Sequence, residues 1–129
     1  MWKSNGTSEG TVRVKDIRAG ASGSLPRDFI SAGGRVLFTA YSEEFGRELW
    51  ATDGTEHGTV LVEDLAPGAV SPILDSLTPI GDKVYFRRDQ ELWSTDGTDS
   101  GTMALTSAAV ESLTAFGEHL LFRANVGSG

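Results

Sequence analysis

The stretch that decides the fold is Glu48-Leu49-Trp50-Ala51-Thr52-Asp53-Gly54-Thr55-Glu56-His57-Gly58-Thr59, because the chain repeats it. A close copy runs from Glu91 to Thr102, and a more distant copy runs from Trp2 to Thr11. Their tryptophans are spaced 48 and then 43 residues apart. Self-similarity at a steady period of this length is typical of repeat architectures.

A second block repeats in step with the first. Gly81 to Phe86 has counterparts in Gly33 to Phe38 and in Gly117 to Phe122. Residues that align in these blocks are called equivalent below. The 129 residues therefore form one array of three repeats, which span residues 2–49, 50–92 and 93–129.

Each repeat predicts four short strands, A to D. In the second repeat strand A covers residues 77–80, strand B residues 83–87 and strand C residues 91–95, and a strand D covers residues 59–64. Gly81-Asp82 supplies the tight turn between strands A and B, because glycine accepts positive φ without a steric cost. We therefore predict an all-β fold. A unit of about 45 residues is typical of a four-stranded propeller blade, and a right-handed solenoid is the alternative.

The order of these strands predicts how the array closes. Strands C and D come first, two complete A-to-D blades follow, and strands A and B come last. Three blades are fewer than the four to eight of ordinary propellers. We therefore expect two chains to form a six-bladed ring as a homodimer, in which strands C and D of the partner complete the last blade. The alternative is an excised or engineered propeller fragment whose role is self-assembly alone.

The motif Glu-Leu-Trp-x-x-Asp-Gly-Thr at Glu48 and Glu91 resembles the ELWxxDGT repeat family, as does the downstream run from Val62 to Gly68. The first copy departs from the family pattern, since Asn5 replaces the aspartate and the preceding Glu-Leu is missing. The resemblance implies a β-propeller-like module of a large secreted or surface protein of bacteria. It implies no defined activity.

The turn after each tryptophan holds Asn5, Asp53 or Asp96, followed by Gly6, Gly54 or Gly97. Asp and Thr oxygens suit Ca²⁺, but the spacing of a calcium loop is absent. Asn or Asp at this place also caps a turn by accepting backbone N–H groups, while glycine takes positive φ. We therefore predict a structural role and no metal site. For the same reason we expect Trp2, Trp50 and Trp93 to pack between blades rather than to stack on sugars.

Loops carry binding residues more often than strands do. The connecting loops at one face of the predicted propeller cover residues 18–27, 41–47 and 66–75. The candidate ligand-binding residues there are Arg18, Tyr41, Glu43 and Glu44.

Composition limits the remaining functions. Eighteen acidic residues against eleven basic ones give a net charge of −7, which disfavours nucleic acid and anionic membranes as partners. The chain has no cysteine, no nucleophile–base motif and no phosphate loop, so we predict neither catalytic residues nor a cofactor. We expect a non-catalytic binding or scaffold module that is extracellular in its parent protein, although this chain shows no targeting signal, and its ligand would be a glycan or a protein. A glycoside-acting hydrolase is the least favoured alternative.

Overall fold

The computed structural model describes residues 1–66 and 71–125, and these ranges contain strands and turns but no helix. The all-β prediction is confirmed for this part of the chain. The strands are β1 (Trp2–Lys3), β2 (Val12–Arg13), β3 (Arg27–Ala32), β4 (Arg35–Ser42), β5 (Gly46–Thr52), β6 (Val60–Leu61), β7 (Leu74–Ile80), β8 (Lys83–Arg88), β9 (Glu91–Thr95), β10 (Met103–Ala104), β11 (Ala109–Phe116) and β12 (His119–Asn125).

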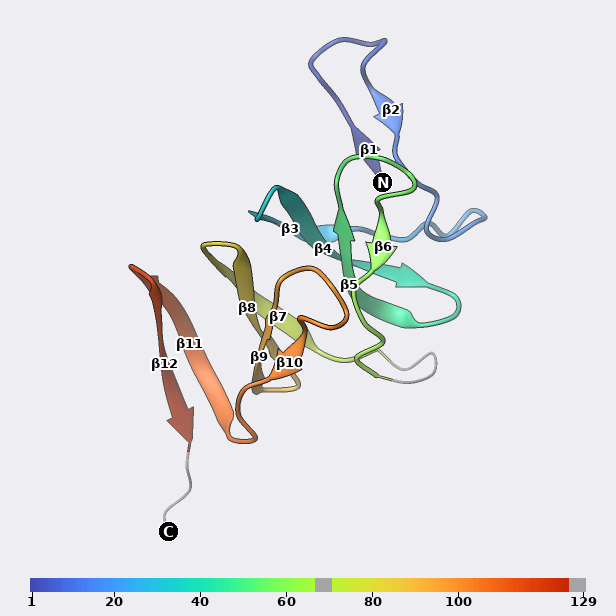
Figure 1. The fold of residues 1–129 in the computed structure, drawn as a ribbon. Helices are drawn as coiled ribbons and strands as arrows, with labels where there is room; N and C mark the ends of the chain where they lie inside the picture. The colour runs from blue at the N-terminus through green and yellow to red at the C-terminus, as the bar shows by residue number, and fades with distance from the viewer. Residues whose placement is uncertain (67–70, 126–129) are drawn as a thin grey trace.

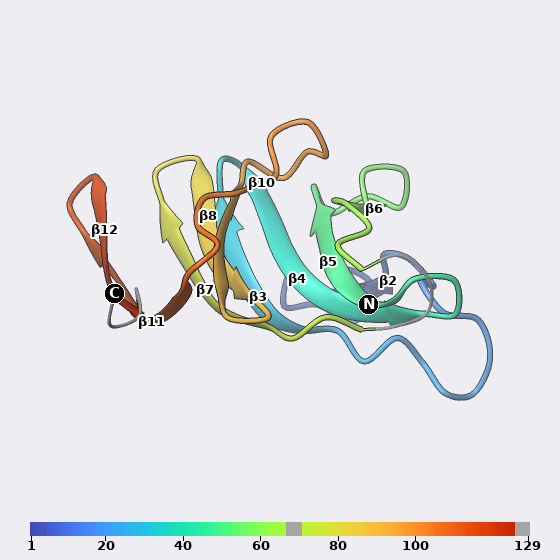
Figure 2. The same cartoon turned by 90° about the horizontal axis from the view of Figure 1, so that it is seen from below.

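These strands form four antiparallel sheets of sequence neighbours. Two sheets have four strands, β3-β4-β5-β6 and β7-β8-β9-β10, and two have two strands, β1-β2 and β11-β12. Figure 2 shows the sheets one beside the other in chain order, with β1-β2 and β11-β12 at opposite ends. Each four-stranded sheet therefore combines strands A and B with the strands C and D that come next in the chain, and its strand C contains the tryptophan.

Adjacent sheets are held by apolar side chains from both of their faces. Leu37 and Leu49 of one four-stranded sheet pack with Val84 and Phe86 of the other, and all four are at most 1% exposed. The opposite face of β3–β6 presents Phe38, Ala40 and Trp50 toward residues of the first sheet and its connection. Alternate residues of β4 and β5 thus face different neighbours, as the two-residue period of a strand requires. Figure 1 shows β1-β2 on one side of the sheet β3–β6 and the sheet β7–β10 on the other.

Strand D is shorter than predicted. β6 ends at Leu61, although the Val62 N–H still donates to the Leu49 carbonyl at 3.0 Å. Val62 is 2% exposed, whereas Val60 is 43% exposed. Val62 reaches the space between the sheets and is covered there. Val60 lies at the outer edge, next to the turn, and stays exposed.

A bulge interrupts strand A in all three copies. The register shifts after Arg27, Asp75 and Glu111, and the next residues, Asp28, Ser76 and Ser112, have φ of 60°, 60° and 59°. Positive φ is uncommon outside glycine. Its recurrence at equivalent positions indicates a shared bend of the strand, since a bulge kinks its strand and increases the local twist.

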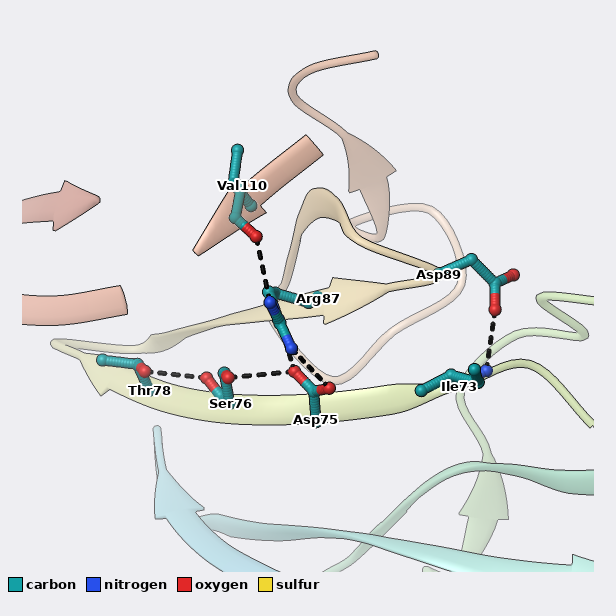
Figure 3. A network of polar contacts seen from close by, with 7 residues as sticks. All are labelled: Ile73, Asp75, Ser76, Thr78, Arg87, Asp89 and Val110. Carbon is teal, nitrogen blue, oxygen red and sulfur yellow. Dashed lines mark hydrogen bonds and ion pairs between the residues drawn. The ribbon is translucent and has the colours of Figure 1, made fainter. Parts of the chain in front are cut away.

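A polar network joins the second four-stranded sheet to the last sheet (Figure 3). The Arg87 guanidinium donates to both carboxylate oxygens of Asp75, at 2.6 and 2.8 Å, and also to the Val110 carbonyl at 3.0 Å. This bidentate pair holds the pKa of Asp75 below its usual range, chiefly through the hydrogen bond from Arg87. Arg87 therefore connects β7, β8 and β11 through one side chain.

Candidate functional site

The turns after the three tryptophans are closed by the same set of hydrogen bonds. In the second copy Asp53 Oδ1 accepts the Thr55 N–H at 2.9 Å and the Thr55 hydroxyl at 2.7 Å. The Gly58 N–H donates to the Thr55 hydroxyl, and the Thr59 hydroxyl donates to the Thr55 carbonyl. The third copy repeats each of these bonds around Asp96 and Thr98.

Asn5 forms the equivalent bonds in the first copy, so its neutral amide oxygen replaces the carboxylate oxygen. Gly6, Gly54 and Gly97 all have φ of 92°, which explains glycine at this place. The Thr55 and Thr98 bonds lower the pKa of Asp53 and Asp96 respectively. Within the described residues no group of three or more His, Asp or Glu side chains is arranged to hold a metal ion. The turn geometry accounts for these residues without a ligand.

Three of the four candidate ligand-binding residues lie together. The Arg18 Nε–H donates to Glu43 Oε1 at 2.5 Å, and its guanidinium carbon lies 4.5 Å from the centre of the Tyr41 ring. Arg18 thus forms an ion pair and a cation–π contact at once. Both contacts join the loop after β2 to the hairpin between β4 and β5.

A cavity of about 340 Å³ lies beside this cluster, and its walls include Arg18, Glu43, Glu44 and Trp50. Tyr41 does not line it. Glu44 is exposed and contributes a carboxylate to the rim, whereas Arg18 is already paired with Glu43. Of the third candidate loop, residues 67–70, with Pro67 and Gly68 of the motif run, lie outside the described residues.

The sequence reasoning missed Glu48, which is 0% exposed. Its Oε1 accepts the Ala66 N–H at 3.1 Å, and its Oε2 has no hydrogen-bond partner among the described residues. Burial raises the pKa of Glu48 to about 7. Strand alternation carried the signal, because Glu48 precedes the buried Trp50 by two residues and so shares its face.

Glu48 has the raised pKa that a hydrolase would need, but it has no access to a substrate. The backbone of the loop at Leu65 and Ala66 covers it. Glu43 and Glu44 lie on a hairpin, where Glu43 is paired with Arg18. Asp64 is the acidic neighbour whose charge adds to the raised pKa of Glu48, after burial as the main cause.

The tryptophans differ in burial. Trp50 is 7% exposed and Trp93 is half-buried, but Trp2 is 66% exposed, contrary to the expectation that it packs between blades. In the intact sheets the tryptophan lies opposite the phenylalanine of strand B, in the pairs Phe38–Trp50 and Phe86–Trp93. Among residues 1–66 and 71–125 Trp2 has no such partner, because β1 pairs there with β2 alone.

The last sheet shows the complementary exposure. Phe122 on β12 is 40% exposed, whereas the equivalent Phe38 and Phe86 are 0% exposed. Leu121 is 54% exposed, whereas the equivalent Leu37 is 1% exposed. β12 pairs with β11 alone, so its other edge carries no strand among the described residues. The two end sheets thus expose the apolar side chains that a complete four-stranded sheet covers.

Comparisons of the chain with protein-family models, with curated proteins and with solved structures find no match. The described residues contain no helix that is long and apolar enough to cross a membrane. The function is therefore argued from the sequence and the geometry.

Proposed function

We propose that this chain is a non-catalytic assembly module that binds a second copy of itself and closes a six-bladed propeller. Each end sheet of one copy joins the opposite end sheet of the other, so β12 gains β1 of the partner as its neighbour. Two junctions of this kind would convert four two-stranded sheets into two four-stranded ones.

The exposure of Trp2 and Phe122 carries this proposal. Two intact copies of the same aromatic pair lie inside the four-stranded sheets, and there the phenylalanines are 0% exposed. Burial of a large apolar side chain contributes about 1.5–3 kcal/mol, and an uncovered sheet edge invites pairing with another chain. Bringing β1 and β12 together satisfies both edges with a pairing that the fold already uses twice.

Charge supports the same pairing. Lys3, Arg13, Lys15 and the amino terminus outnumber the acidic Glu9 and Asp16 in the segment that forms the first sheet. In the last sheet Glu111 and Glu118 outnumber Arg123. The chain as a whole is acidic, with a net charge of −7, so a basic first sheet favours this contact over random association.

The proposal is tested by light scattering after size exclusion on Phe122→Lys, which puts a charge in the middle of the free edge. The unmodified chain should have twice the mass of 13.7 kDa, and Phe122→Lys should have the mass of a monomer. Ile73→Lys is the matched control, because Ile73 is 69% exposed on a loop beside the intact sheet, and it should stay dimeric. A dimeric Phe122→Lys, or a monomeric parent chain, would refute the proposal.

A second candidate function is ligand binding at the cluster of Arg18, Tyr41 and Glu43 and the cavity beside it. The observation that favours it is the convergence of Arg18, Tyr41 and Glu43 from separate segments. We propose a glycan or a protein as the ligand, in an extracellular bacterial parent, as the family resemblance implies. A glycan array followed by Tyr41→Ala and Glu44→Ala tests it, and unchanged affinity of a ligand in both variants would refute the location.

A further inference from the structure

A cavity of about 390 Å³ lies between the first sheet and β3–β6, and its lining combines apolar side chains with charged ones, namely Lys3, Arg35 and Asp53. Its walls include Met1, Val14, Phe29 and Val36. Phe29 stacks on Phe38 with ring centres 5.3 Å apart, yet Phe29 remains 52% exposed and lines this cavity. The cavity therefore presents an uncovered apolar surface at the junction of two sheets.

The corresponding junction between the two four-stranded sheets shows what fills such a space. There the equivalents of Met1, Val14, Val36 and Phe29 are Leu49, Val62, Val84 and Leu77. Leu49, Val62 and Val84 belong to one apolar cluster, and Leu77 packs against it. Leu37 of β4, which is 1% exposed, joins this cluster from strand B of the neighbouring sheet. The residue equivalent to Leu37 in the third repeat is Leu121.

We propose that a second copy of this chain places its Leu121 in the cavity beside Phe29, through pairing of β12 with β1 in the register that sets Phe122 opposite Trp2. This inference rests on the proposed function and specifies its interface. The register follows from the pairs Phe38–Trp50 and Phe86–Trp93, which occupy the same place in the intact sheets. Leu121 then points to the face opposite Phe122, toward β3–β6 of the partner.

The register predicts one neighbouring pair that is suited to a chemical test. Val36 lies opposite Thr52, and Val84 lies opposite Thr95, so Leu120 of one copy should lie opposite Ser4 of the other. Directly opposed residues have Cα atoms about 4.5–5.5 Å apart, which is within disulfide range. A slip of two residues moves the partner by about 7 Å and out of range.

The chain has no cysteine, so introduced thiols are the only ones that react. Ser4→Cys with Leu120→Cys should oxidise to a covalent dimer, and it leaves Trp2, Leu121 and Phe122 in place. The matched control combines Ser4→Cys with Glu118→Cys, which lies two residues away in the β11–β12 turn and should stay uncrosslinked. A dimer by mass that links more readily through Glu118→Cys would overturn the register but leave the assembly intact. A parent chain with a monomer's mass would instead refute the assembly.

The cavity itself is tested with Leu121→Ala. Truncation of a buried leucine should weaken the dimer and raise its dissociation constant at least about 30-fold, as measured by sedimentation over a dilution series. Ile73→Ala removes an aliphatic side chain that is 69% exposed, and it should change the constant less than about threefold. Leu121→Ala with the dissociation constant of the parent would overturn the placement of Leu121 in the cavity.

Discussion

Replacing Glu48 with glutamine should abolish a pH dependence that a single buried carboxyl creates. Glutamine keeps the oxygen that accepts the Ala66 N–H and removes the charge. Burial raises the pKa of Glu48 from its ordinary value of 4.5 to about 7 in the folded protein. The folded chain therefore binds this proton more tightly than the unfolded chain does.

The sign of the effect follows from proton linkage. The extra stability from protonated Glu48 is fully present below the unfolded pKa, near 4.5, and is lost as pH rises through about 7. The pKa difference corresponds to about 3 kcal/mol of unfolding free energy over that range. Glu48→Gln should thus gain up to about 3 kcal/mol over the parent chain at about pH 8 and little at about pH 4.5.

Urea unfolding followed by tryptophan fluorescence measures this difference, at one protein concentration so that association contributes equally to the chains compared. Glu91→Gln is the matched control, because Glu91 is equivalent to Glu48 but half-buried. Its unfolding free energy should follow that of the parent chain to within about 0.5 kcal/mol. Parallel pH profiles for the parent and Glu48→Gln would refute the reasoning that burial perturbs Glu48.

Three further variants test other parts of the structure. Phe86→Ala should lower the unfolding free energy by about 3–5 kcal/mol in urea titrations, because Phe86 is 0% exposed and its ring lies 6.4 Å from that of Trp93; an effect below about 1 kcal/mol would contradict the core assignment. Asp53→Asn should retain the melting temperature, as Asn5 makes the same bonds, whereas Asp53→Ala should lower it in thermal circular dichroism; equal melting of both would show that the cap is dispensable. Asp75→Asn should weaken the bidentate pair with Arg87 and reduce the loss of unfolding free energy on acidification, because the pKa of Asp75 is lowered and its contribution disappears as pH falls. The same loss of unfolding free energy at low pH in the parent and in Asp75→Asn would contradict this role.

Local chemistry made strands B and C of the repeat predictable, whereas strand A begins at Leu74 instead of Leu77. β8 and β9 lie at Lys83–Arg88 and Glu91–Thr95, within one residue of the positions expected from alternating residues and from the Gly81 turn. Both signals depend on neighbours in sequence. The bulge at Ser76 escaped prediction because it bends a strand without changing its residue pattern, and serine gives no sign of positive φ.

The sites depended on contacts that sequence patterns specify less well. The positions of the predicted loops were enough to select Arg18, Tyr41 and Glu43, which lie together in the structure. The pairing of Arg18 with Glu43 was not predictable, because it depends on where two separate segments meet. The exposure of Trp2 escaped prediction because burial of a repeated residue depends on whether its neighbouring strand is present.

The mass of the unmodified chain in solution, measured by light scattering across a dilution series, tests the central claim most directly. Closure by two copies predicts one discrete species at twice 13.7 kDa, with no larger species as concentration rises, because closure pairs the free edges of β1 and β12 in both copies. A folded monomer at all concentrations, or a ladder of species that grows with concentration, would contradict closure by mutual completion of the end sheets.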